Sequence, residues 1–187
     1  MYQVMVVDDE PMAASLIVNI IKRKYSDFEI MGTAYDGEEA LELMEEKGEP
    51  DVLITDIQMP VMNGLKLVEE TKKRYPEVIS VIVSGYQEFE YAKQAIAFGV
   101  CDYILKPIVP SEFSKLITRI EEKLRQKYYK ERNTLMHKMV NEIPIDEKTL
   151  RRYFQSECYY GAIVRLNGLP SRYGERGKKK SFQTSMR

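Results

Sequence analysis

The chain alternates short aliphatic runs with helical patterns, and each aliphatic run ends abruptly at a polar residue. Runs of this length, separated by amphipathic helices, are typical of the buried strands of a parallel sheet. Parallel crossovers place helices on both faces of such a sheet, so the alternation predicts a doubly wound α/β domain. The expected strands are residues 3–7, 28–34, 52–56, 78–83 and 103–105.

Helices are expected between these strands, each with an apolar stripe that faces the sheet. Pro11 and Pro110 are placed to begin the first and the fifth helix, and Gly48 and Gly99 to end the second and the fourth. The first helix is expected to bury Leu16, Ile17, Ile20 and Ile21, and the fourth Phe89, Ala92, Ala95, Ile96 and Phe98. Five strands and five helices fit a flavodoxin-like five-stranded sheet of order 2-1-3-4-5.

Polar side chains stand where the predicted strands end. They are Asp8, Asp9, Asp56, Ser84 and Lys106. Because ligands of open parallel sheets bind just outside the carboxyl ends of the strands, we expect these side chains to converge on one edge. Three neighbouring carboxylates repel one another unless a cation is present, and Mg²⁺ prefers oxygen ligands. The sequence therefore predicts a site for Mg²⁺ and a phosphoryl group.

Each residue of this site has an expected role. We expect Asp9 and Asp56 to ligate the metal directly, Asp8 to act through water, and the backbone carbonyl of Gln58 to be a further ligand. A carboxylate oxygen of Asp56 can attack phosphorus and form an aspartyl phosphate. The ammonium group of Lys106 and the hydroxyl group of Ser84 would then bind phosphoryl oxygens on the side opposite the metal.

These motifs resemble those of bacterial response-regulator receiver domains. The matching pieces are Asp8-Asp9, Asp56 in Thr-Asp-Ile-Gln-Met-Pro-Val-Met-Asn-Gly, Ser84-Gly85-Tyr86, and Lys106-Pro107. The resemblance implies that a sensor histidine kinase phosphorylates Asp56, and that Ser84 and Tyr103 form a conformational switch pair. It also implies a cis peptide bond at Lys106-Pro107. The face formed by the fourth helix, fifth strand and fifth helix would change shape and support a phosphorylation-dependent homodimer.

Residues 84–93 and 101–108 are also similar to the receivers that are fused to AraC-type DNA-binding domains. That similarity implies a transcription factor that accepts a phosphoryl group and controls transcription. The two helix-turn-helix units that would bind DNA are absent from these 187 residues. We therefore expect DNA contact only through a C-terminal domain that this sequence does not include.

Charge divides the chain into two parts. Residues 1–127, the expected receiver domain, hold 15 basic and 23 acidic residues, whereas residues 128–187 hold 13 and 6. The fifth helix has no stop signal near residue 125 and continues toward Asn141 and Pro144, and Asp146 is placed to cap a further short helix. We interpret residues 128–166 as a helical linker and a partial linker domain with one strand at 160–166. Residues 167–187 are expected to be a disordered basic tail.

Composition narrows the remaining possibilities. The chain is 44% hydrophobic and 30% charged, as is usual for soluble globular proteins, and it has no apolar run long enough to cross a bilayer. Cys101 and Cys158 have no metal-ligand spacing, so two reduced thiols and a cytoplasmic location are expected. His137 is interpreted as a surface residue, and the basic run 178–180 as part of the tail rather than a nucleic-acid site.

Two other functions are compatible with an aspartyl phosphate. A Mg²⁺-dependent phosphatase of the haloacid dehalogenase type would need a general acid two residues after Asp56, but Gln58 cannot donate a proton. A stand-alone phosphorelay receiver without DNA output is the other alternative. Whether it is a transcriptional regulator or a stand-alone receiver, the chain is not expected to be an enzyme beyond its own phosphotransfer and dephosphorylation. Gln58 and Tyr86 are expected to tune the lifetime of the phosphate by orienting or shielding a hydrolytic water.

Overall fold

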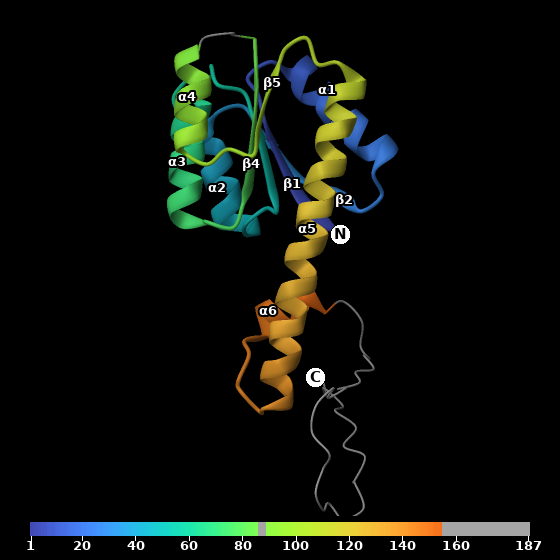
Figure 1. Ribbon diagram of the computed structural model, residues 1–187. Coiled ribbons are helices and arrows are strands. Elements are labelled where there is room, and N and C mark those ends of the chain that lie inside the picture. Colours follow the sequence, from blue (N-terminus) through green and yellow to red (C-terminus); the bar gives the residue numbers. More distant parts are fainter. Residues whose placement is uncertain (86–88, 155–187) are drawn as a thin grey trace, which may run out of the picture. The chain divides into compact units, whose positions relative to one another are not determined.

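A computed structural model of the protein describes residues 1–85 and 89–154 (Figure 1). Strands and helices alternate from the N-terminus to α5, and one further helix follows. Their bounds are β1 Tyr2–Val7, α1 Pro11–Lys24, β2 Phe28–Ala34, α2 Gly37–Lys47, β3 Val52–Thr55, α3 Gly64–Arg74, β4 Ile79–Ser84, α4 Phe89–Ala97, β5 Asp102–Leu105, α5 Pro110–Val140 and α6 Glu147–Tyr153.

The five strands form one parallel sheet in the order β2-β1-β3-β4-β5. This confirms the predicted fold class and strand order. β1 lies between β2 and β3, and its last residue, Val7, is paired with Ala34 on one side and with Thr55 on the other. The residues that follow β1 and β3 therefore leave the sheet side by side at its carboxyl edge.

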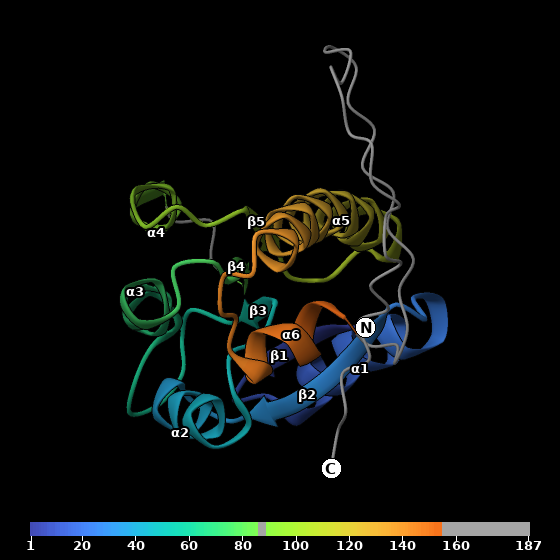
Figure 2. The ribbon, with the colours of Figure 1, turned by 90° about the horizontal axis from the view of Figure 1, so that it is seen from below.

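Helices cover both faces of the sheet (Figure 2). On one face, Val4 and Val6 of β1 belong to a buried cluster that includes side chains of α1 and α5. On the other face, Met5 and Val7 belong to a second cluster with side chains of α2, α3 and α4. Because successive strand residues point to opposite faces, the two acids that continue β1 start out in opposite directions.

The helix ends follow from local sequence, but two expected core residues do not lie in the core. Pro11 stands in the first turn of α1, and Gly48 ends α2 with a φ of 102°, a conformation that suits glycine. Leu16 is 43% exposed and Ile96 is 77% exposed, so both predictions were wrong. The stripes that contact the sheet are narrower than expected: α1 buries Ala14, Ile17 and Ile21.

The chain divides into two compact units, one of residues Met1–Gln126 and one that begins at Lys127. α5 is a single helix that contributes to both. In the second unit, the rings of Tyr128 and Tyr153 lie 4.9 Å apart and Leu135 is buried. The short helix expected after Asp146 is α6, and the Asp146 side chain accepts a hydrogen bond from the Thr149 amide.

The expected strand at 160–166 and the expected tail at 167–187 lie outside the described residues. Within the ranges that the structure covers, no helix is both long enough and apolar enough to cross a membrane.

Candidate functional site

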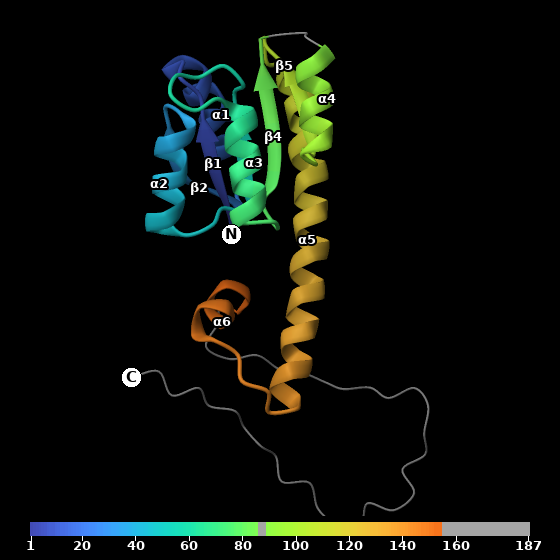
Figure 3. The same cartoon turned by 90° about the vertical axis from the view of Figure 1, so that its left-hand side faces the viewer.

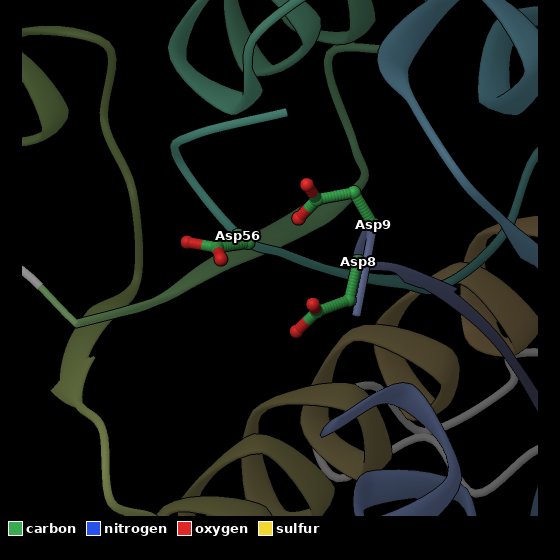
Figure 4. A group of neighbouring side chains, drawn as sticks. All are labelled: Asp8, Asp9 and Asp56. Atoms are coloured by element: carbon green, nitrogen blue, oxygen red, sulfur yellow. The ribbon is translucent and has the colours of Figure 1, made fainter. Parts of the chain in front are cut away.

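Three aspartates meet at the carboxyl edge of the sheet (Figure 4). Asp8 and Asp9 follow β1, and Asp56 follows β3. The ladder of backbone hydrogen bonds continues past the strand ends: the Asp8 amide donates to Ala34 O at 3.1 Å, and the Asp56 amide donates to Val7 O at 2.9 Å. The sheet itself therefore fixes the main chain at two of the three acids.

The carboxylates are close enough to share one cation. Asp8, Asp9 and Asp56 each offer an oxygen, and these oxygens lie within 4.8 Å of one another. Asp8 is 2% exposed and Asp56 is 7% exposed, while Asp9 is half-buried. In Figure 4 the side chains of Asp8 and Asp9 diverge from neighbouring positions, and that of Asp56 lies beside them.

Lys106 supplies the positive charge of the site. Its Nζ lies 2.8 Å from Asp56 Oδ2 and 3.0 Å from Asp8 Oδ2. Lys106 follows β5, and its amide donates to Ser84 O at 2.7 Å, which ties the end of β5 to the end of β4. The peptide bond between Lys106 and Pro107 is cis, as the family resemblance implied.

Burial and charge act against each other in this cluster. Burial is the largest effect on Asp8 and raises the pKa of its carboxyl group, although hydrogen bonds from Lys106 and from the Glu10 amide lower it. Burial alone would lower the pKa of Lys106, because it disfavours the charged ammonium group. The hydrogen bonds to Asp56 and Asp8 outweigh burial, so the pKa of Lys106 is raised. The structure thus favours the charged form of Lys106 and disfavours the charged form of Asp8.

The residues present fit a divalent cation. Three carboxylates and one ammonium group leave a formal charge of −2 on the cluster. Asp8 Oδ2 is buried and accepts no hydrogen bond from the described residues, although the Lys106 ammonium group lies near it. Buried polar atoms usually have a hydrogen-bond partner or a ligand, and carboxylate oxygens suit Mg²⁺.

The Asp56 carboxylate is held at both of its oxygens. Oδ1 accepts a hydrogen bond from the Ile57 amide at 2.5 Å, and Oδ2 faces Lys106. Its backbone carbonyl accepts a hydrogen bond from the Thr55 hydroxyl at 2.8 Å. Gly64 passes so close that a Cβ there would lie 1.8 Å from Asp56 O, so only glycine fits. A carboxylate fixed in this way at a strand end is positioned to act as a nucleophile.

Gly64 and Thr55 were not recognised from the sequence as residues that position Asp56. In the sequence, residues 59–64 have only the composition of a loop before a helix. Asn63 caps α3 by accepting a hydrogen bond from the Lys66 amide. The close approach to Asp56 depends on how the loop folds back, which no local pattern records.

The other residues predicted for the site lie on β4, on β5 and in the loop after β3, and one lies outside the described residues. Ser84 ends β4 and is fully buried, and Tyr103 on β5 is half-buried. Gln58 lies on the loop after β3, two residues beyond Asp56, with an exposed side chain. Tyr86 lies outside the described residues.

A parallel α/β sheet whose carboxyl edge carries three aspartates, a lysine and a cis X–Pro bond is the arrangement of a receiver type of signalling domain. The sequence of residues 4–119 matches the response regulator receiver domain family, and the chain belongs to this family. Receiver domains bind Mg²⁺ at an acidic pocket, which is the position of the aspartate cluster here.

Individual relatives agree with this assignment. The chain is 36% identical over 141 residues to the uncharacterized transcriptional regulatory protein YesN of Bacillus subtilis, an alignment that covers 74% of this chain and 38% of YesN. It is 36% identical over 120 residues to the transcriptional regulatory protein HptR of Staphylococcus aureus, covering 64% of this chain and 46% of HptR. It thus spans less than half the length of either regulator.

Among solved structures, the REC domain of AraT, a response regulator from Geobacillus stearothermophilus, superposes with a TM-score of 0.63 at 36% identity. The match covers 67% of this chain and 97% of that one. The family assignment favours the receiver over the haloacid dehalogenase alternative, the other class with an aspartyl nucleophile.

Proposed function

We propose that Asp56 accepts a phosphoryl group from a phosphohistidine of a sensor histidine kinase. The observation that carries this proposal is the Asp56 carboxylate, fixed at the sheet edge within 4.8 Å of two further carboxylates and 2.8 Å from an ammonium group. A carboxylate oxygen of Asp56 attacks phosphorus and forms an O–P bond. The P–N bond to the imidazole breaks, and the imidazole leaves with the electron pair and takes up a proton.

The surrounding residues divide the charge of this transfer between them. Asp9 and Asp56 would ligate Mg²⁺ directly, Asp8 would act through water, and the backbone carbonyl of Gln58 would complete the protein ligands. Bound there, Mg²⁺ neutralises the charge of the phosphoryl oxygens. Lys106 and the Ser84 hydroxyl bind phosphoryl oxygens on the opposite side.

Apolar side chains around the site provide a surface on which a phosphodonor protein can dock. Met12 at the start of α1 is 87% exposed, and Val61 in the loop after β3 is 75% exposed. Val109 in the loop after β5 is 45% exposed. All three belong to segments that leave the carboxyl edge of the sheet, where Asp56 lies.

Phosphorylation is proposed to switch the receiver through Ser84 and Tyr103. The Ser84 hydroxyl turns toward the phosphoryl group, and the Tyr103 ring moves inward. Gln58 and Tyr86 are proposed to tune the lifetime of the phosphate.

After phosphorylation, the face of α4, β5 and α5 is proposed to support a homodimer. Sedimentation velocity with and without beryllofluoride tests the dimer, and an unchanged sedimentation coefficient would contradict it.

The output is proposed to be transcription. Residues 1–127 form the receiver domain and residues 128–166 a linker region, and an AraC-type DNA-binding domain outside these 187 residues would contact DNA. Two observations support this: the chain matches the receiver part of longer proteins, and YesN and HptR are transcriptional regulatory proteins.

Acetyl phosphate with Mg²⁺ tests the phosphoacceptor directly, because it needs no partner kinase. Intact-mass spectrometry is expected to show one added phosphoryl group on the wild-type chain. Asp56→Asn replaces the nucleophile with an amide of the same shape and is expected to abolish the addition. Asp27→Asn makes the same chemical change at an exposed acid outside the cluster and is expected to leave it intact. Full modification of Asp56→Asn would refute the assignment.

A further inference from the structure

Two backbone hydrogen bonds hold the loop between β3 and α3. One joins its two ends: the Gly64 amide donates to Ile57 O at 2.9 Å, and Gly64 packs against Asp56 O. The other lies near the start of α3, where the Gly37 amide donates to Met62 O at 3.1 Å. Gly37 is the first residue of α2, so this bond joins the phosphoacceptor loop to a different helix. Figure 3 shows the loop passing over the carboxyl edge of the sheet before it enters α3.

The Met62 side chain occupies the space that a side chain at position 37 would need. A Cβ on Gly37 would lie 2.7 Å from Met62 Cγ, 2.8 Å from Sδ and 2.9 Å from Cβ. Met62 Cβ cannot move away unless the backbone moves, and Cγ and Sδ can move away only if the side chain adopts another χ1 rotamer. Gly37 is buried and Met62 is half-buried against the core cluster of α2 and α3.

The backbone beside this contact has little freedom to adjust. Val61, which precedes Met62, has a φ of 58°. A β-branched residue in this left-handed conformation is strained, and such strain persists only where the surroundings impose it. Contacts at positions 62 and 64 thus impose the path of the loop, and the loop carries Asp56 and Gln58.

We propose that Gly37 is a positioning residue for the phosphoacceptor site and acts through Met62. The absence of a side chain at position 37 lets Met62 seat against α2, and the seated Met62 keeps the loop in the register that places Asp56 and Gln58. The inference rests on the proposed function of Asp56. The inference adds Gly37 to the residues that position Asp56, although Gly37 lies on α2 and has no atom in the acid cluster.

Gly37→Ala is expected to push Met62 outward and move the loop. Displacements of about 1 Å can slow a reaction ~100-fold, so a roughly tenfold slower phosphorylation by acetyl phosphate is expected for the smaller shift that one methyl group causes. The Mg²⁺ dissociation constant, followed by amide chemical shifts of Asp56 and Ile57 without any phosphodonor, is expected to rise as well. Gly32→Ala is the matched control, because a Cβ there meets its nearest neighbours at 3.6 Å.

The decisive variant is the double substitution. Met62→Ala removes Cγ and Sδ, the two nearest of the three colliding atoms, and leaves only Met62 Cβ at 2.9 Å. Gly37→Ala with Met62→Ala is therefore expected to recover part of the lost rate and Mg²⁺ affinity. Met62→Ile adds a branch next to Gly37 and is expected to reproduce the defect without altering the glycine. This variant keeps the test valid if Gly37→Ala does not fold.

The outcomes separate the two proposals. A wild-type chain that takes no phosphoryl group would refute the proposed function. A wild-type chain that is phosphorylated, with a folded Gly37→Ala or Met62→Ile variant of unchanged rate and Mg²⁺ affinity, would overturn the positioning role alone. A defect that Met62→Ala does not relieve would overturn it too, because Gly37 would then act by another route.

Discussion

Asp8 is expected to lower the stability of the metal-free protein. Its carboxylate is buried, and burial raises its pKa in spite of the hydrogen bonds from Lys106 and the Glu10 amide. The folded state therefore disfavours the charged form, and Asp8→Asn supplies a neutral group of the same shape. We expect this variant to be more stable than the wild-type protein in EDTA at neutral pH, because the folded state no longer holds a buried charge at position 8. Urea unfolding measures the difference.

The raised pKa of Asp8 also sets the sign of a pH dependence. The unfolded carboxyl group loses its proton near its ordinary pKa of 3.8, while the folded one keeps it to higher pH. Between these two values the folded state binds more protons, so stability falls as pH rises through the interval. Asp8→Asn is expected to remove this contribution, and Asp27→Asn to leave it. An Asp8→Asn variant less stable than wild type in EDTA would contradict the argument.

At this scale, the sequence identified residues that end an apolar run but not residues that act through contact. Asp56 and Lys106 were predictable because each follows an apolar run, and both runs end at the same edge of a parallel sheet. Gly64 and Gly37 were not, because their importance lies in a close approach to Asp56 O and to Met62. A one-dimensional pattern marks a glycine as a turn and does not show what passes beside it.

At the scale of single elements, α2 depends on the residue before its first turn. The Asp36 carboxylate accepts hydrogen bonds from the amides of Glu38 at 2.8 Å and Glu39 at 3.0 Å. Asp36→Ala is expected to destabilise the protein by about 1 kcal/mol, within the ~0.5–2 kcal/mol typical of lost N-caps. Asp36→Asn keeps the acceptor oxygen and is expected to lose less. Thermal or urea unfolding compares the variants, and equal losses for alanine and asparagine would argue against capping.

The elements themselves were predictable because their aliphatic content forces burial on both faces of the sheet. β2 has the predicted bounds, and the others differ by one residue or so at an end. It was harder to predict which residues at the edges of the helical apolar stripes are exposed. Leu16 lies next to buried Ile17 and about 100° around the helix from it, so whether it is covered depends on the width of the contact. Periodicity gives the direction of a stripe and not its width.

At the scale of the whole molecule, α5 runs through both units, whereas the two core clusters found among the described residues lie in the first unit. Every member of the two core clusters precedes residue 125, and the last is Leu124 on α5. The acid cluster and Lys106 also lie within the first unit. The excess negative charge of residues 1–127 and the excess positive charge of the remainder show the same division in composition.

A chain that ends after Gln126 is therefore expected to unfold cooperatively and to take up one phosphoryl group from acetyl phosphate at close to the wild-type rate. A chain that ends after Lys115 would lose Leu116, Ile117, Ile120 and Leu124. Burial of each such side chain contributes roughly 1.5–3 kcal/mol, so the four together rival the ~5–15 kcal/mol that stabilises a domain, and this shorter chain is expected not to fold. Calorimetry and intact-mass spectrometry decide the matter: loss of the cooperative transition or of phosphorylation in the 126-residue chain would show that the receiver needs the second unit.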